Sequence, residues 1–242
     1  MKKLLFWIFL ISGTALILGS CAKKEESDDA AATVTTGTGS TASGTISGIE
    51  NLTGTFNLSF NGEEPSGGCI SNSTAIAALS SLLPSNTLGL KFQVIITSST
   101  TWTASVQYYS DASCATLTGY FNLGYKNASV GDSLSGLSAG SSPAKPTTAK
   151  KISYNSDFTA LKSNTDTTTS HFNTLFGTST LSTLGFTQGT ELNVDDTDEA
   201  QELNIWETGT VSGSSKTYLF FGDAHSTNYP SDWTSADVWW QE

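Results

Sequence analysis

The sequence predicts an all-β fold in which about eight antiparallel strands form a single barrel, with a β-sandwich as the alternative. Three observations lead to this prediction. Apolar residues alternate with Ser, Thr and Gln in several segments, which is the period of two that a half-buried strand requires. Turns rich in Gly, Ser and Asn separate these segments. Helical spacing of apolar residues is confined to two segments.

The alternation is clearest in segment 102–108, where Trp102, Ala104, Val106 and Tyr108 share one face and Thr103, Ser105 and Gln107 share the other. Segments 53–60 and 117–125 alternate in the same way. Segment 88–97 is more continuously apolar, as expected of a strand that is covered on both faces. Further strands are expected at 150–154, 201–210, 216–222 and 237–241.

Two helices are expected. Segment 74–83 has apolar residues at helical spacing, Asn72 or Ser73 as its N-cap, and Pro84 as its stop. The second expected helix has one apolar face, formed by Phe158, Leu161, Thr165, Phe172, Leu175 and Phe176. A run of β-branched residues within this segment disfavours a helix. Segment 138–148 contains Pro143 and Pro146 and is expected to be a long exposed loop.

The N-terminus has the pattern of an export signal. Lys2 and Lys3 precede an apolar run from residue 4 to residue 18, which is shorter than the roughly 20 residues of a transmembrane helix. The run ends in Leu18-Gly19-Ser20-Cys21, which resembles the lipobox of bacterial lipoproteins. The resemblance implies that residues 1–20 are a signal peptide, that the chain is cleaved before Cys21, and that the Cys21 thiol carries lipid, including palmitate.

Residues 21–44 are expected to be a disordered tether, acidic at first and then rich in Thr, Gly and Ser, and residues 45–242 are expected to be one domain. Two or three acyl chains would make the attachment to the membrane effectively permanent. Ala22 rather than Asp follows Cys21, and by resemblance to known sorting rules this favours the outer membrane. The sorting rules leave open whether the protein faces the periplasm or the cell exterior.

The composition argues against nucleic acid as a partner. The chain has eleven Lys, no Arg and twenty-two acidic residues, a formal charge of −11. Loss of Lys2 and Lys3 with the signal peptide would leave nine Lys against twenty-two acids, which is −13. Arginine is the usual bidentate ligand of phosphates and base edges, and an acidic chain is repelled by both nucleic acid and anionic lipid headgroups.

Cys69 and Cys114 are the two cysteines that remain after Cys21. In an exported protein we expect them to form a disulfide, which on the chain-entropy model would stabilise the fold by roughly 4 kcal/mol. The alternative, a thiolate metal site, would need further Cys or His residues, and the sequence has none near either position.

One segment resembles a known family. Tyr108-Tyr109-Ser110-Asp111-Ala112-Ser113-Cys114, followed by Gly119-Tyr120-Phe121-Asn122-Leu123-Gly124, resembles a signature of lipocalin-like exported bacterial proteins of uncertain function. In that family a glycine-flanked upstream cysteine, here Cys69, pairs with the cysteine of the motif. A strand near 150–154 that leads into a helix, and a late strand ending in Phe221-Gly222, follow in the expected order. The tryptophan often found before the first cysteine is missing, and the middle loop is long.

The resemblance implies an up-and-down barrel whose interior is packed or holds one small apolar ligand. The leading hypothesis is therefore a non-enzymatic, lipid-anchored barrel that binds such a ligand. Its pocket is expected to be formed by Trp102, Val106, Phe121, Leu123, Phe220 and Trp240. The alternative is a surface interaction or adhesion protein with a solid barrel, which would meet a macromolecular partner through its Ser/Thr faces and segment 138–148.

The tryptophans of the domain would either fill the core or line this pocket. Trp239 and Trp240 point to opposite faces of the last strand, so one of them is expected to be exposed at an edge or at the barrel mouth.

No motif indicates catalysis or a bound cofactor. Residues 136–140 match G-x-S-x-G, but a Ser/Gly loop surrounds them in place of a strand-to-helix turn. His171 and His225 are too few for a metal site, and none is expected. The acidic run 195–199, continued by Glu202, could attract a hard cation such as calcium, but it lacks the spacing of an EF-hand, and a solvated turn is favoured.

Overall fold

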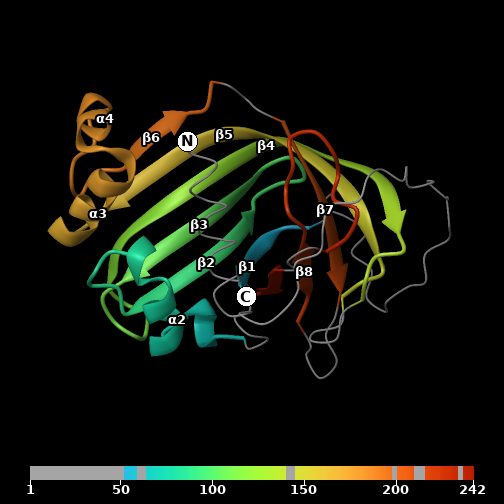
Figure 1. Ribbon diagram of the computed structural model, residues 1–242, viewed down its shortest axis with the longest axis horizontal. Coiled ribbons are helices and arrows are strands. Elements are labelled where there is room, and N and C mark those ends of the chain that lie inside the picture. The colour runs from blue at the N-terminus through green and yellow to red at the C-terminus, as the bar shows by residue number, and fades with distance from the viewer. Residues whose placement is uncertain (1–51, 59–63, 140–144, 198–200, 210–215, 234–236) are drawn as a thin grey trace, which may run out of the picture.

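The computed structural model describes residues 52–58, 64–139, 145–197, 201–209, 216–233 and 237–242 (Figure 1). The predicted signal peptide (1–20), the lipid-bearing Cys21 and the predicted tether (21–44) lie outside the described residues. The expected loop 138–148 is described only at its two ends, and Asp198 and Glu199 of the acidic run lie outside as well.

Eight strands form a closed antiparallel barrel, which confirms the predicted fold class and excludes the sandwich. Each strand pairs with its neighbours along the chain, and β9 pairs with β1 to close the barrel, so the topology is up-and-down apart from β6. A further strand, β6 (Leu192–Asp195), pairs with β5 outside the barrel. The barrel strands are β1 (Gly54–Leu58), β2 (Gly89–Ile96), β3 (Trp102–Tyr109), β4 (Leu117–Ser135), β5 (Thr148–Ser163), β7 (Gln201–Gly209), β8 (Tyr218–Phe221) and β9 (Asp237–Gln241).

All the predicted strands are present, but β4 and β5 are longer than expected. β4 continues past Tyr125 to Ser135, and β5 continues past Tyr154 to Ser163. Their pairing shifts register at three points, between Gly124 and Tyr125 and twice more towards Ser133. Each such irregularity shifts the alternation of faces, so the period of two that identifies a strand in the sequence is lost there.

The predicted first helix is present as two short pieces, α2 (Ser73–Ala78) and the 3-10 turn η3 (Ser80–Leu82). The Asn72 side chain accepts a hydrogen bond from the Thr74 backbone N–H at 2.8 Å, as expected of the N-cap. Another 3-10 turn, η2 (Ser66–Gly68), precedes Cys69.

The second predicted helix is correct only in its later half. Phe158 and Leu161 belong to β5, and the helix α3 (Asp166–Phe176) begins after Thr165. Residues three apart share a face in a helix but lie on opposite faces of a strand, so a short stripe does not distinguish the two. The Thr165 hydroxyl accepts from the Thr168 backbone N–H at 3.3 Å, and this cap favours the helix despite its β-branched first turn. A shorter helix, α4 (Thr178–Thr183), follows directly.

Helix α3 covers one end of the barrel. Figure 1 shows α3 and α4 at the same end of the long strands as α2. The Phe172 ring, which is fully buried, lies 6.0 Å from the ring of Tyr108, and Phe176 stacks on Phe121 at 5.7 Å. Side chains of α3 therefore pack against β3 and β4 at this end of the barrel. Within the described ranges, no helix combines the length and the apolar character that a bilayer crossing requires.

The Cys-containing motif forms a turn that Asp111 organises. Its carboxylate accepts hydrogen bonds from the backbone N–H groups of Ser113 (3.0 Å), Ala115 (3.1 Å) and Thr116 (2.6 Å), and from the Ser113 hydroxyl. These bonds hold the pKa of Asp111 well below its usual value. Cys114 takes a left-handed backbone conformation (φ 53°) and forms the predicted disulfide with Cys69.

Gly89 allows the disulfide turn to pack against β2, and we predict that Gly89→Ala destabilises the protein. A Cβ at this position would lie 2.5 Å from the Asp111 carbonyl oxygen and 2.8 Å from the Cys114 sulfur. Overpacking against backbone costs about 1–3 kcal/mol, which urea unfolding measures. The control is Gly131→Ala in β4, where the nearest atom to the new methyl group, the Lys151 carbonyl oxygen, lies at 3.5 Å. Equal stabilities for the two variants would contradict this explanation.

We predict that His171 makes stability depend on pH. Burial lowers the pKa of His171 in the folded protein to about 4, although a hydrogen bond to the Leu82 backbone opposes the shift. The unfolded chain protonates this residue near pH 6.5, so the free energy of unfolding falls as the pH falls from about 6.5 towards 4. Urea unfolding at pH 7 and pH 4.5 should show a smaller loss for His171→Leu than for the wild type. The matched control is His225→Leu, because His225 is exposed. Between pH 7 and pH 4.5 this variant should lose as much unfolding free energy as the wild type does.

Candidate functional site

Five aromatic side chains meet inside the barrel. The ring of Trp102 is their centre: it stacks on Tyr125 at 4.0 Å and meets the other three rings edge to face at 5.0 to 5.5 Å. Strand β3 is not a neighbour of β7 or β8 in the sheet, so these contacts cross the interior. All five side chains are buried. We call this group the inner aromatic cluster, and it consists of Trp102, Tyr125, Tyr154, Trp206 and Phe221.

Four of the six residues predicted to line a pocket lie on the inner face. Trp102 pairs with Tyr125, and Val106 pairs with Phe121, across the β3–β4 register. Leu123 lies between these two pairs and is also part of the core. Trp102 is thus at the centre of the inner aromatic cluster, whereas Phe121 is covered by Phe176 of α3.

The other two predicted pocket residues, Phe220 and Trp240, lie on the outer face, and the prediction of their orientation was wrong. Their neighbours Phe221 and Trp239 belong to the inner core, and successive residues of a strand alternate between faces. Phe220 and Trp240 pack instead into a second cluster outside β7, β8 and β9, together with Leu137 and Trp233. The Trp233 indole N–H donates to the Pro146 carbonyl at 2.8 Å, and this hydrogen bond holds Trp233 in the outer cluster.

The expectation that one of the two adjacent tryptophans is exposed was also wrong. Trp239 and Trp240 are each only 3% exposed. The Lys216 ammonium lies 3.5 Å from the centre of the Trp240 ring, a cation–π contact on the outer side. Both faces of β9 are therefore covered, and neither tryptophan is available as a surface contact.

Buried indole N–H groups inside the barrel have no acceptor. Among the described residues, the Nε1 atoms of Trp102, Trp206 and Trp239 on the inner face are buried and make no hydrogen bond, and the same holds for Trp240 on the outer face. A buried donor without an acceptor costs about 1–3 kcal/mol, and such groups are rare in folded proteins. Trp102 and Trp206 belong to the same cluster, with ring centroids 5.2 Å apart. The interior thus combines an aromatic wall with donors that an acceptor could bind.

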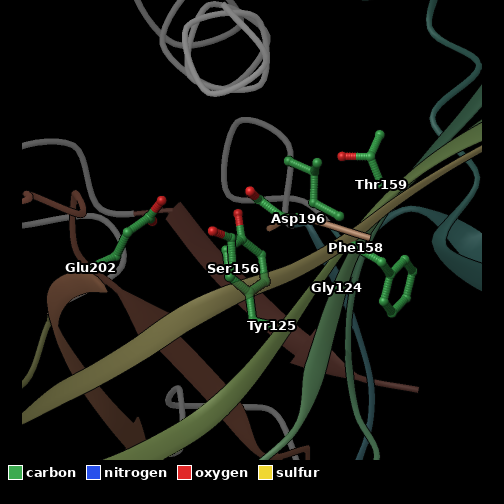
Figure 2. A pocket seen from close by; sticks show the side chains of 8 residues that line it. Gly124, Tyr125, Ser156, Phe158, Thr159, Asp196 and Glu202 are labelled. Atoms are coloured by element: carbon green, nitrogen blue, oxygen red, sulfur yellow. The ribbon is translucent and has the colours of Figure 1, made fainter. Parts of the chain in front are cut away.

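A small pocket opens in the wall of the barrel where β5 changes its partner. Residues Lys150–Asn155 of β5 pair with β7, and residues Phe158–Leu161 pair with β6. Between them β5 passes Ser156 and Asp157, and the Asp157 carbonyl accepts from the Asp196 backbone N–H at 2.6 Å. The pocket has a volume of about 20 Å³ and is shown in Figure 2. Its lining residues are Leu123, Gly124, Tyr125, Ser156, Phe158, Thr159, Asp196 and Glu202.

The polar side chains of this pocket carry only oxygen atoms. Glu202 is 5% exposed, so the expectation of a solvated acidic turn was wrong for this residue, which is the second residue of β7. Burial, and then the charges of Glu202 and Asp196, raise the pKa of the Tyr125 phenol well above its usual value. The phenol therefore stays protonated as a hydrogen-bond donor. The pocket is acidic and adjoins the inner aromatic cluster through Tyr125.

Sequence reasoning missed most of this pocket. Ser156 has no distinguishing signal in a chain rich in serine, and the Ser156–Asp157 irregularity removes the alternation that would show its orientation. The acidic run drew attention to Glu202. Of the acidic residues that the structure describes here, Asp196 and Glu202 line the pocket, whereas Asp195 is exposed.

The remaining motifs do not form a catalytic or metal centre within the described part of the chain. The Ser138 hydroxyl and backbone N–H both bond to the Asp232 carboxylate, at 2.5 and 2.8 Å, and Ser138 is exposed beyond the end of β4. The two histidines lie on different elements: His171 is in α3, and His225 is in the segment after β8. The described residues contain no group of three His, Cys, Asp or Glu side chains that could hold a metal ion.

Comparison with known proteins gives no family assignment: no protein-family model matches the chain, and no curated protein matches it.

Proposed function

We propose that the mature chain is a bacterial cell-envelope lipoprotein, anchored in the outer membrane by lipid on Cys21, and that its barrel binds one small apolar molecule without catalysing a reaction. The signal and lipobox pattern of residues 1–21 supports the anchor. One observation carries the binding function: the unbonded indole donors of Trp102 and Trp206 inside an aromatic cluster.

The chemistry of the cluster defines the kind of ligand. Stacked and edge-to-face rings offer a wall to an apolar body, which is how small-molecule sites gain most of their buried area. The two indole N–H groups add directional donors, so the ligand should carry a hydrogen-bond acceptor such as a carbonyl or ester oxygen. Phe172 and Phe176 fill the end of the barrel near α3. The ligand would therefore reach Trp102 from the opposite end, where this residue follows the β2–β3 turn.

The alternative is an envelope protein with a solid barrel that acts through its outer surface. The contact distances inside the inner aromatic cluster favour this alternative, because rings at 4.0 and 5.0 Å already fill the space between them. The two functions differ in one physical respect: whether the rings around Trp102 separate to admit a molecule.

Binding of an apolar fluorophore to the lipid-free mature chain (residues 22–242) tests the ligand site. We expect saturable binding at one site, with quenching of tryptophan fluorescence. Trp102→Phe keeps an aromatic ring but removes an inner donor, so it should weaken binding about tenfold, the equivalent of one net hydrogen bond. The matched control is Trp240→Phe, which removes an equally buried indole from the outer face and should bind as the wild type does.

Absence of binding by a folded chain with its disulfide intact would contradict the ligand site and support the solid barrel. An equal loss of binding in the two variants would contradict the assignment of the site to the interior.

Incorporation of a palmitate analogue tests the anchor. In a bacterium that expresses the chain with its leader, we expect the protein to be labelled, and Cys21→Ser to abolish the label and leave the precursor uncleaved. Cys114→Ser removes the disulfide partner but not the lipidated thiol, so it should keep the label and serves as the control. Labelling of the Cys21→Ser variant would contradict the lipobox interpretation.

A further inference from the structure

The pocket in the barrel wall has a composition that favours a particular class of ligand. Eight residues line it, and none of their side chains contains nitrogen or sulfur. The oxygen atoms belong to two carboxylates, Asp196 and Glu202, and to hydroxyl groups that include those of Ser156 and Tyr125. Side-chain carboxylates and hydroxyls are ligands of hard cations, whereas softer transition metals prefer imidazole and thiolate.

Ser156 provides a second and independent indication. This side chain is only 7% exposed, and its hydroxyl oxygen makes no hydrogen bond to any described residue. The side chain lines the pocket beside Tyr125 and Asp196, as Figure 2 shows. A buried hydroxyl without a partner is costly, and one that lines a pocket with two carboxylates gains a partner when a cation enters the pocket.

The size of the pocket separates the candidate ligands. A volume of about 20 Å³ holds one water molecule or one ion and excludes an organic amine. A water molecule could bond to Ser156 but would bring no positive charge to a pocket that Asp196 and Glu202 line. A cation in the pocket would attract the carboxylates and also give the Ser156 hydroxyl a partner.

We propose that this pocket is a binding site for a hard divalent cation of the calcium class, held by Asp196, Glu202 and the Ser156 hydroxyl. The coordination shell of calcium needs six to eight oxygens, so backbone carbonyls and water would complete it. The site is a feature of the β5 irregularity and does not depend on the ligand proposed for the barrel interior. Oxygen sites on extracytoplasmic proteins bind calcium with dissociation constants of roughly 0.1–1 mM, and we expect an affinity in this range.

Terbium ion, a luminescent substitute for calcium, is the probe. Titration of the full chain in detergent solution should give saturable terbium luminescence on excitation of the aromatic residues, because Tyr125 lines the pocket and Trp102 stacks on Tyr125. Calcium chloride should displace the bound terbium. Calcium should also raise the melting temperature of the protein relative to a sample in EDTA, as expected for an ion that binds only the folded state.

Three substitutions locate the site. Glu202→Gln removes one charge with little change of shape and should weaken terbium binding at least tenfold, and Ser156→Ala should weaken it several-fold. Asp195→Asn is the matched control: it removes the same charge from the neighbouring exposed carboxylate, which does not line the pocket, and should leave binding unchanged. In EDTA, Glu202→Gln should melt at or above the temperature of the wild type, because a buried charge has been removed.

Two results would overturn the proposal. One is the absence of saturable terbium binding by the folded chain, and the other is an equal loss of binding in Glu202→Gln and Asp195→Asn, which would indicate general attraction to surface acids. If Glu202→Gln failed to fold, Ser156→Ala would decide the question, because unchanged terbium binding in that variant would also refute the site.

Discussion

The stacking of Tyr125 on Trp102, with three more rings around it, is the interaction on which the architecture depends. Trp102 lies on β3, and its partners lie on β4, β5, β7 and β8, so this one side chain connects the two halves of the barrel. Aromatic pairs of this kind contribute about 0.5–1.5 kcal/mol each beyond the burial of their area. The same packing buries two indole donors without acceptors, and this local deficit is the feature that points to ligand binding.

The covering of β7 to β9 on both faces follows from the same alternation. Trp206 and Phe221 point inward, so Ile205 and Phe220 must point outward, where Leu137 and Trp233 cover them. Next to β7 in the barrel, β5 has two partners in succession, and the irregularity between them leaves the acidic pocket. Tyr125 belongs to both regions, since its ring stacks on Trp102 and its side chain lines the pocket. The two proposed sites are therefore physical neighbours.

The strands could be predicted from the sequence wherever polar residues mark one face, as Thr103, Ser105 and Gln107 do in β3. The faces could not be assigned in β8, where all four residues from Tyr218 to Phe221 are aromatic or aliphatic, and this absence of a polar marker placed Phe220 on the wrong side. In β9 the adjacent Trp239 and Trp240 gave the same ambiguity, and Trp240 was placed on the wrong side as well. The pocket could not be predicted, because it depends on a register shift and on an ordinary serine, Ser156. The sequence pattern indicates neither this register shift nor the orientation of Ser156.

Whether the buried indole N–H groups of Trp102 and Trp206 lack an acceptor can be read from their signals in a nitrogen-15 NMR spectrum of the lipid-free chain. Trp233 is an internal reference, because its N–H is bonded to the Pro146 carbonyl. We predict that the indole N–H signals of Trp102 and Trp206 lie upfield of that of Trp233, as unbonded donors do, and move downfield when an envelope lipid extract is added. Signals at the hydrogen-bonded position in the lipid-free chain, unchanged by the extract, would contradict it and would establish a solid barrel.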